Sequence, residues 1–353
     1  MARQRRKFTQ VNVDIDAIER LRLKAGYSFT DIDDRGVMHP DTYRSMLEFH
    51  DVRSDKFDAL VAMFGVERND LLMDRVDGGP RKQAPYGLPS TEEWTVDDSS
   101  PPSAWKTSPN GLQYRICRMQ HVAIADHFGR GKFYDLLGVR RDLRVELHNH
   151  LHRHAVVAKS VGPCAHLGQL LSCVPAAAGD GWWVVDRWID GRSLHDYISD
   201  GSWQNEKLPQ LMKDILQGLT VLHSHNIVLR ELNPECVLIP AVRQPAVIMD
   251  FEMAKLQSGA PTVRPEHWPS GPFRAPELES TQVTPATDLF SWAALLLNAA
   301  TGFKPEDSNW REAIAKADLP SAVVDIVRQC LSSAPSQRPK NCDAVRKAIS
   351  KWT

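Results

Sequence analysis

Six short segments between residues 183 and 339 constrain this chain more than any other feature of its sequence. They read WVVDRWIDGRSLHDYI (183–198), VLHSHNIVLRELNPECVLI (221–239), VIMDFEMAK (247–255), FRAPE (273–277), ATDLFSWAALLLNAATG (286–302) and QRP (337–339).

In this order, the six segments resemble a protein kinase domain. The first resembles the last strand of the N-terminal lobe, the hinge and the helix that follows, and the second resembles the catalytic loop. The resemblance implies an α+β fold of the bilobal kinase type. It also implies three structural residues: Asp288, which anchors the start of the central helix, and Glu277, which pairs with the late Arg338.

The catalytic loop departs from the family pattern at the positions that carry the chemistry. Where the family reads HRDLKPEN, residues 229–236 read LRELNPEC. Glu231 therefore stands at the base position, one methylene longer than aspartate, and a misplacement near 1 Å costs about 10²-fold in rate. Asn233 replaces the lysine that neutralises the phosphoryl group. Cys236 replaces the Mg²⁺-binding asparagine, and a thiol is a poor ligand for a hard cation.

The other nucleotide-binding positions are only partly retained. Asp250 keeps the metal-binding position of the DFG motif, either as a metal ligand or, as we favour, as a fold residue that forms local hydrogen bonds, and Glu252 replaces the glycine of the motif. No GxGxxG loop is present. The phosphate-gripping lysine has two candidate registers, Arg118 in YRICRM (114–119) or Ala125 in HVAIAD (121–126), and neither is lysine. We predict a surface turn for GRGKFYDL (129–136), which leads into a helix.

These changes act on one activation barrier, so they favour a catalytically inactive pseudokinase that works as a sensor or scaffold. Two alternatives stay open. ATP could bind with weak or no magnesium, or the chain could be an atypical Ser/Thr kinase that uses Glu231 and Asp250. Arg230, retained from the HRD motif, would either pair with a phosphorylated Ser258 or Thr262 or simply brace the activation loop. We favour the brace.

The N-terminal segment has helical periodicity over 12–75. Ile15, Ile18 and Leu21 fall on one face of a first helix, and three further helices are expected at 28–36, from Pro40, and at 54–65. This order, with the ending FGVERNDLL (64–72), resembles the helix-turn-helix domain of phage repressors. In that family the third helix enters the major groove. The residues that would contact DNA are Asp41, Thr42, Arg44 and Ser45.

The charge of this segment is poorly suited to DNA. Residues 1–74 hold 12 Lys and Arg against 14 Asp and Glu, whereas phosphate neutralisation supplies most non-specific affinity. A role restricted to dimerisation or docking is therefore an equal alternative. We predict a basic tail (1–11), the helical domain (12–75), a Pro- and Ser-rich linker (76–104), and kinase-like N- and C-lobes (105–190 and 191–353).

Composition excludes several classes of protein. The net charge of −1 over 353 residues argues against a chain that coats nucleic acid, and 42% hydrophobic residues is ordinary for a globular protein. Six cysteines without CxxC spacing suit reduced thiols in the cytoplasm. No run is long enough to span a membrane. The histidine run 148–154 gives two i, i+4 pairs, which we interpret as a polar helix face rather than a metal site.

The combination predicts a bacterial or phage-related regulator. A protein partner is expected and a homodimer is an alternative. A role in phage defence is suggested by the stretch 129–136.

Overall fold

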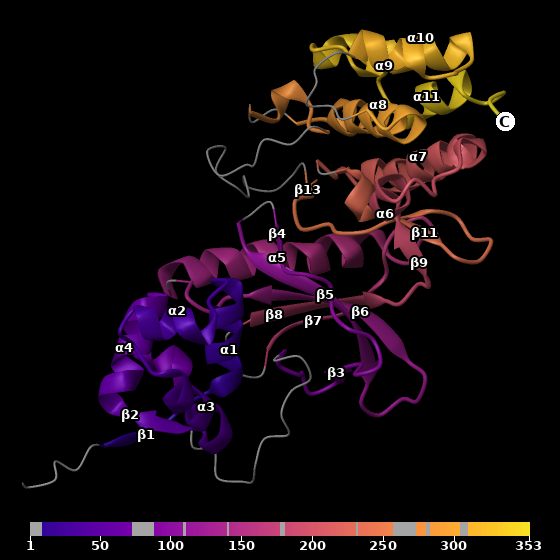
Figure 1. Ribbon diagram of the computed structural model, residues 1–353. Helices are drawn as coiled ribbons and strands as arrows, with labels where there is room; N and C mark the ends of the chain where they lie inside the picture. Colours follow the sequence, from indigo (N-terminus) through magenta and orange to yellow (C-terminus); the bar gives the residue numbers. More distant parts are fainter. Residues whose placement is uncertain are drawn as a thin grey trace, which may run out of the picture. The chain divides into compact units, whose positions relative to one another are not determined.

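The structure is a computed structural model that describes residues 9–72, 88–108, 111–139, 141–176, 181–230, 232–256, 273–279, 283–303 and 310–353, without the side chains of 141–150. It forms two compact units (Figure 1). The first comprises Met1–Thr107, Leu112–Leu147 and Val174–Trp183, and the second comprises Ser108–Gly111, His148–Cys173 and Val184–Thr353. This division differs from the predicted boundaries, because the N-terminal helices share a unit with part of the sheet.

Four helices open the chain, as the periodicity predicts: α1 (Ile15–Lys24), α2 (Phe29–Asp34), α3 (Pro40–Phe49) and α4 (Ser54–Phe64). Their starts follow from local chemistry. The Asp14 side chain accepts from the backbone of Ala17, and Ser28 forms a capping box with Asp31. A feature absent from the prediction is the antiparallel pair of β1 (Gln10–Asn12) and β2 (Asp51–Arg53), and the 3₁₀ turn η1 (Arg68–Leu71) closes the segment.

These helices pack against the end of a sheet strand within the first unit. Leu137 is 1% exposed and belongs to the same apolar cluster as the cores of α1, α3 and α4. Lys24 forms an ion pair of 3.3 Å with the buried Asp135. The guanidinium of Arg20 lies 5.5 Å from the centre of the Phe133 ring. The N-terminal helices are therefore fixed to the strand that ends at Asp135.

The sheet has the strand order β3-β5-β6-β8-β7, with β4 paired to β5. Its strands are β3 (Trp94–Val96), β4 (Lys106–Thr107), β5 (Gln113–His121), β6 (Phe128–Asp135), β7 (Leu170–Pro175) and β8 (Gly181–Arg187). The 21-residue helix α5 (Arg141–Val161) follows β6. Strand β3 lies inside the stretch expected to be linker, so residues 94–96 belong to the sheet.

The expected surface turn at 129–136 is wrong, because these residues form most of β6. Its glycines suggested a turn, but Gly131 serves close packing. A Cβ there would lie 2.3 Å from Met119 Sδ and 2.8 Å from the Trp183 ring. Glycine inside a strand often marks such an approach rather than a turn.

The second unit is mostly helical. It contains α6 (Leu194–Ser199), α7 (Leu208–Ser224), α8 (Pro285–Thr301), α9 (Trp310–Lys316), α10 (Ser321–Cys330) and α11 (Cys342–Ala348). The short strands are β9 (Gly191–Ser193), β10 (Ile227–Val228), β11 (Val237–Pro240), β12 (Val247–Ile248) and β13 (Lys255–Leu256). Helix α8 is buried from Ala286 to Ala299, which confirms the expected central helix. Among the described residues, no helix could cross a membrane.

Candidate active site

The catalytic loop is anchored by Asp288, at the start of α8. This carboxylate is fully buried. It accepts hydrogen bonds from the backbone N–H groups of Leu229 (2.9 Å) and Arg230 (2.8 Å) and from His223 Nε2 (2.8 Å). Burial alone lowers the pKa of His223, but the bonds to Asp288 and Cys342 outweigh it and raise this pKa to about 10. The anchoring role implied for Asp288 is confirmed.

Arg230 is buried. It braces the segment that follows the turn at residues 250–252, which corresponds to the DFG motif and is called the metal turn here. Its backbone is left-handed (φ 69°), and its Nε donates to the carbonyl oxygen of Met253 at 2.6 Å. This contact supports the brace interpretation of Arg230. The two candidate phosphorylation sites, Ser258 and Thr262, lie outside the described residues.

The implied pairing of Glu277 with Arg338 is confirmed. Arg338 donates to both carboxylate oxygens of Glu277, at 2.6 and 2.8 Å, and its side chain has no exposed surface. Burial raises the pKa of Glu277, but the bonds from Arg338 and other donors outweigh it and hold this pKa below its usual value. Glu277 lies on the 3₁₀ turn η6 (Pro276–Glu279) and Arg338 directly follows η8 (Pro335–Gln337). The ion pair therefore joins two distant parts of the chain.

Two of the degenerate catalytic-loop residues bond to each other. The thiol of Cys236 lies 3.2 Å from both the backbone N and the carbonyl O of Asn233. The Asn233 side chain accepts from the backbone of Glu235 and Cys236, capping the 3₁₀ turn η4 (Pro234–Cys236). Cys236 is only 4% exposed. The predicted base, Glu231, lies outside the described residues.

The metal turn follows β12. Asp250 adopts a left-handed backbone (φ 62°), which is uncommon for a non-glycine residue and marks functional sites. The next residue, Phe251, is buried in the apolar core of the second unit. Glu252 is also buried, at 4% exposure. No group of three or more His, Cys, Asp or Glu in the described part of the chain is arranged to hold a metal ion.

Neither sequence register for the phosphate-gripping lysine lies on β6, the strand that directly precedes α5. Protein kinases carry this lysine on the third strand, before the helix that supplies its partner. In this chain that strand is β6, and it carries Lys132. The sequence analysis missed Lys132 because it interpreted β6 as a turn; the helical run that follows at 141–161 was the signal that could have identified the strand.

The three candidate residues for this position have different surroundings. Lys132 is 3% exposed, and its Nζ lies 4.2 Å from the centre of the Tyr114 ring. Arg118 lies one strand earlier, on β5, where it pairs with Asp97. Ala125 lies in the turn between β5 and β6.

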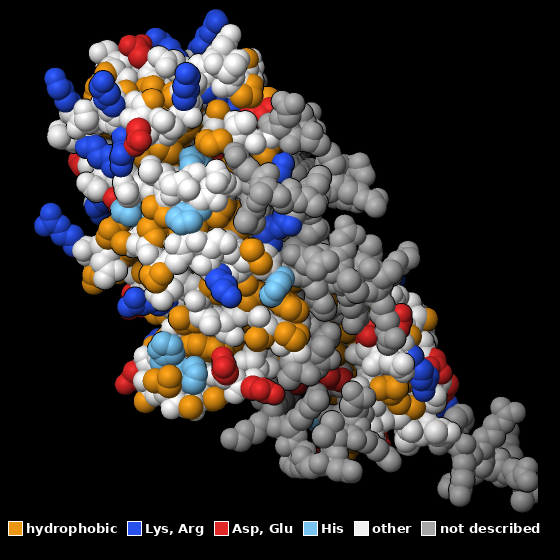
Figure 2. Space-filling model, turned by 180° about the vertical axis from the view of Figure 1, so that it is seen from behind, with side chains coloured by type: hydrophobic (Ala, Val, Ile, Leu, Met, Phe, Trp, Pro, Cys, Tyr) orange, Lys and Arg blue, Asp and Glu red, His pale blue; other side chains and the backbone are white. Residues whose placement is uncertain are grey.

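The predicted DNA-contacting residues lie on the solvent side of α3. All four are exposed, but Arg44 forms an ion pair of 2.9 Å with Asp41. On the face seen in Figure 2, the N-terminal helices at lower right show acidic and basic side chains side by side. A basic stripe typical of DNA-binding surfaces is not visible on this face.

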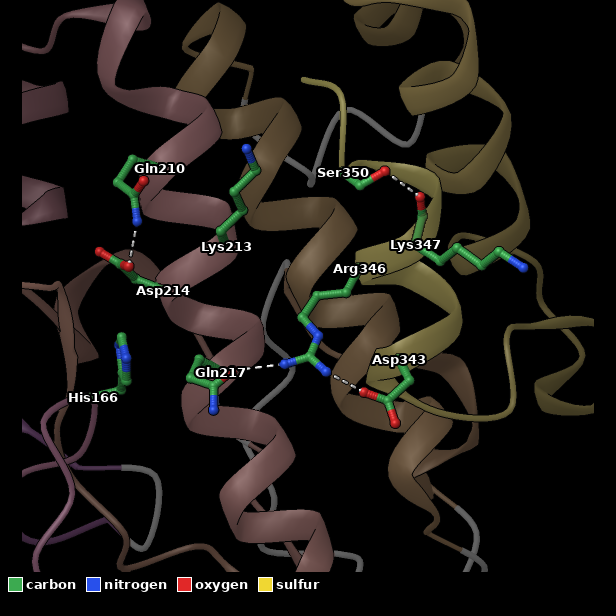
Figure 3. Close-up of a pocket in the computed structure, with 9 residues that line it drawn as sticks. All are labelled: His166, Gln210, Lys213, Asp214, Gln217, Asp343, Arg346, Lys347 and Ser350. Atoms are coloured by element: carbon green, nitrogen blue, oxygen red, sulfur yellow. Dashed lines mark hydrogen bonds and ion pairs between the residues drawn. The ribbon is translucent and has the colours of Figure 1, made fainter. Parts of the chain in front are cut away.

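A separate cavity of about 710 Å³ lies between α7 and α11 (Figure 3). Its polar groups are largely engaged within the protein. Lys213 donates to the carbonyl oxygen of Trp352, and Arg346 donates to Gln217. Asp214 accepts from the backbone of Ala246. A ligand here would have to compete with these bonds, so we do not assign the catalytic chemistry to this cavity.

The strand order, the buried central helix with its aspartate anchor, the metal turn and the Glu277–Arg338 pair together define a protein kinase-like fold. A sequence model of the protein kinase domain family matches residues 145–349. The chain therefore belongs to the protein kinase domain family.

Known proteins similar to the chain agree with this assignment. The chain is 29% identical over 203 residues to a probable serine/threonine-protein kinase, PkwA, of Thermomonospora curvata, covering 54% of this chain and 27% of that protein. It is 27% identical over 147 residues to the serine/threonine-protein kinase PkaB of Streptomyces coelicolor, covering 36% and 35%. The chain thus spans about a third or less of these curated relatives.

Among solved structures, the Mycobacterium tuberculosis PknI kinase domain is similar at a TM-score of 0.54 and 16% identity. The match covers 74% of this chain and 97% of that one. At this identity, the likeness supports the fold alone.

Proposed function

We propose that the chain is a regulatory protein whose kinase domain binds nucleotide without efficient phosphoryl transfer. The observation that carries this proposal is the bonding of Cys236 to Asn233. In an active kinase, the position of Asn233 supplies a cation and the position of Cys236 supplies an oxygen ligand for Mg²⁺. In this chain the two positions hold an amide and a thiol, which bond within the loop. Removing one group that stabilises developing charge typically costs about 10²–10³ in kcat.

Nucleotide binding is the part of the function that the remaining residues support. A lysine on the third strand grips the phosphates of ATP in kinases, and the aspartate of the metal turn holds Mg²⁺. Lys132 and Asp250 are the residues of this chain that fit those roles. The buried thiol of Cys236 does not fit the second Mg²⁺-binding position, so weak magnesium dependence is expected.

Binding and transfer can be measured separately. With ATP, we expect the melting temperature of the full chain to rise, and Lys132→Met to remove the rise. The matched change at the exposed Lys159, Lys159→Met, should leave it intact. In a radiolabel transfer assay, wild type should not exceed the Glu231→Gln variant. Transfer that Glu231→Gln abolishes while the fold stays intact would overturn the proposal.

An active Ser/Thr kinase is the second candidate. Lys132 and the left-handed Asp250 favour it, because an enzyme needs both the phosphate-gripping lysine and a formed metal turn. The same transfer assay decides between the two, since only the active kinase predicts turnover that depends on Glu231.

For residues 12–75 we propose a docking or dimerisation role, with DNA binding through α3 as the alternative. The pairing of Arg44 with Asp41 supports docking, because it places a carboxylate beside the one cation among the four α3 residues. A mobility-shift assay at low salt, where phosphate contacts are strongest, separates these roles. A sequence-specific shift that Arg44→Ala abolishes would favour DNA.

A further inference from the structure

A histidine and an aspartate lie together in the interior of the second unit. His154 of α5 is 2% exposed and Asp186 of β8 is 1% exposed. His154 Nε2 lies 3.2 Å from Asp186 Oδ1. Replacing a buried ionic or polar pair by apolar residues is often neutral or stabilising. Asp186 follows a run of buried apolar residues on its strand, Trp183, Val184 and Val185, so a role beyond packing is indicated.

The hydrogen bonds fix which ring nitrogen carries the proton. The backbone N–H of Phe251 donates to His154 Nδ1 at 3.1 Å, so Nδ1 must present a lone pair. In the neutral ring the proton then lies on Nε2, which donates to Asp186. Both ring nitrogens of His154 therefore have a partner. Asp186 favours the tautomer in which Nδ1 can accept the hydrogen bond from the Phe251 N–H.

This acceptor supports the turn that carries Asp250. The left-handed backbone of Asp250 is strained, and such strain persists only where the surroundings over-determine it. Before the turn, Met249 donates its N–H to the carbonyl oxygen of Cys236 at 2.7 Å. Directly after Asp250, the support comes from His154, whose ring also lies 5.2 Å from the Phe251 ring, centre to centre.

We propose that His154, oriented by Asp186, is a positioning residue that holds the Asp250–Phe251 turn in its left-handed conformation. The contact ties α5 to the turn through the backbone N–H of Phe251. The inference rests on the proposed binding of nucleotide at Asp250. The pair does not itself take the role of Lys132 or Asp250; it acts through Phe251, by the hydrogen bond to its backbone and the contact with its ring.

Two amide substitutions of His154 separate its two bonds. In His154→Asn the side-chain oxygen can take the place of Nδ1, which keeps the acceptor for Phe251 and loses the bond to Asp186. In His154→Gln the side-chain amide can take the place of Nε2, which keeps the donor and loses the acceptor. Asp186→Asn, nearly identical in shape, removes the charge that orients the ring.

Hydrogen exchange of the Phe251 amide is the readout. We expect His154→Gln to speed it by about 10-fold or more and His154→Asn by less than about 3-fold, the difference of one hydrogen bond. Asp186→Asn should fall between them. The amides of Leu229 and Arg230, which bond to Asp288, serve as internal controls and should stay protected. The loss of affinity for ATP with Mg²⁺ should follow the same order, largest in His154→Gln and smallest in His154→Asn.

Equal exchange at Phe251 in the Asn and Gln variants, with the controls protected, would overturn the positioning role. If both His154 variants lose protection throughout the domain, Asp186→Asn decides the question. A folded Asp186→Asn variant with unchanged hydrogen exchange at the Phe251 amide would also overturn the positioning role. If wild type binds no nucleotide, the proposed function fails, but the exchange measurement still decides whether His154 holds the turn.

Discussion

Replacing Asp288 by asparagine is expected to lower the free energy of unfolding of the kinase domain by about 3–5 kcal/mol, the usual cost of breaking a buried ion pair. Asparagine offers one acceptor and one donor, whereas the site contains three donors, from Leu229, Arg230 and His223. The NH₂ group of asparagine would then face the backbone N–H of Leu229 or of Arg230, and two donors would oppose each other. At about 2–4 °C per kcal/mol for a domain of this size, thermal denaturation should show a drop of at least about 6 °C.

The pH dependence of this loss distinguishes the ion pair from simple packing. The pKa of His223 is raised to about 10 in the folded protein, above the value of about 6.5 expected when unfolded. Its contribution is therefore complete below about pH 6.5 and is lost as the pH rises through 10. The difference in the free energy of unfolding between wild type and Asp288→Asn should therefore become smaller as the pH rises from about 6.5 to 10.

The surface pair of Asp343 and Arg346 supplies the matched control. The Asp343 side chain is 64% exposed, so Asp343→Asn should change stability by at most about 1 kcal/mol. An equal loss in the two variants, or an Asp288→Asn penalty that does not vary with pH, would contradict the anchoring role of the His223–Asp288 pair.

The fold of the second unit was predictable because its signals are local. The apolar run of α8 is too long for a strand, and Thr284, Pro285 and Gly302 mark its ends. The four N-terminal helices were predictable for the same reason. Their contact with the sheet was not, because it depends on single residues such as Leu137 and Asp135, which lie far from α1 in sequence and carry no periodic signal.

The candidate site was predictable only where a motif names its residues. Asp288, Glu277 and Arg338 are found in this way. Lys132 was missed because two glycines near it resemble a turn, and only the sheet shows that Gly131 makes room for Met119 and Trp183.

The histidine run gives a second example of this limit. Four histidines alternate along α5, and the sequence does not tell that His154 is buried. The answer depends on Asp186, 32 residues away on a strand, and on a backbone N–H that belongs to the metal turn. Such partners are set by packing and are invisible to local patterns.

Restoring the catalytic loop is expected to restore phosphoryl transfer. We predict that the triple change Glu231→Asp, Asn233→Lys and Cys236→Asn raises the transfer rate by at least about 10²-fold. The three changes return the base to its usual length, supply a cation for the transferring phosphoryl, and give Mg²⁺ an oxygen ligand. Lys132 and Asp250 are already present, so we attribute the expected lack of phosphoryl transfer to the catalytic loop.

The measurement is radiolabel transfer from ATP by the full chain, beside circular dichroism to confirm the fold, since Asn233 caps a turn. Adding Lys132→Met to the triple variant should return the rate to background, because the gain requires a bound nucleotide. A folded triple variant that binds ATP yet gains nothing would place the defect elsewhere, with Glu252 the first position to test because it adds a carboxylate next to the metal turn. Rapid transfer by wild type, in the range of about 1–100 per second found for active kinases, would show that the degenerate loop is competent as it stands.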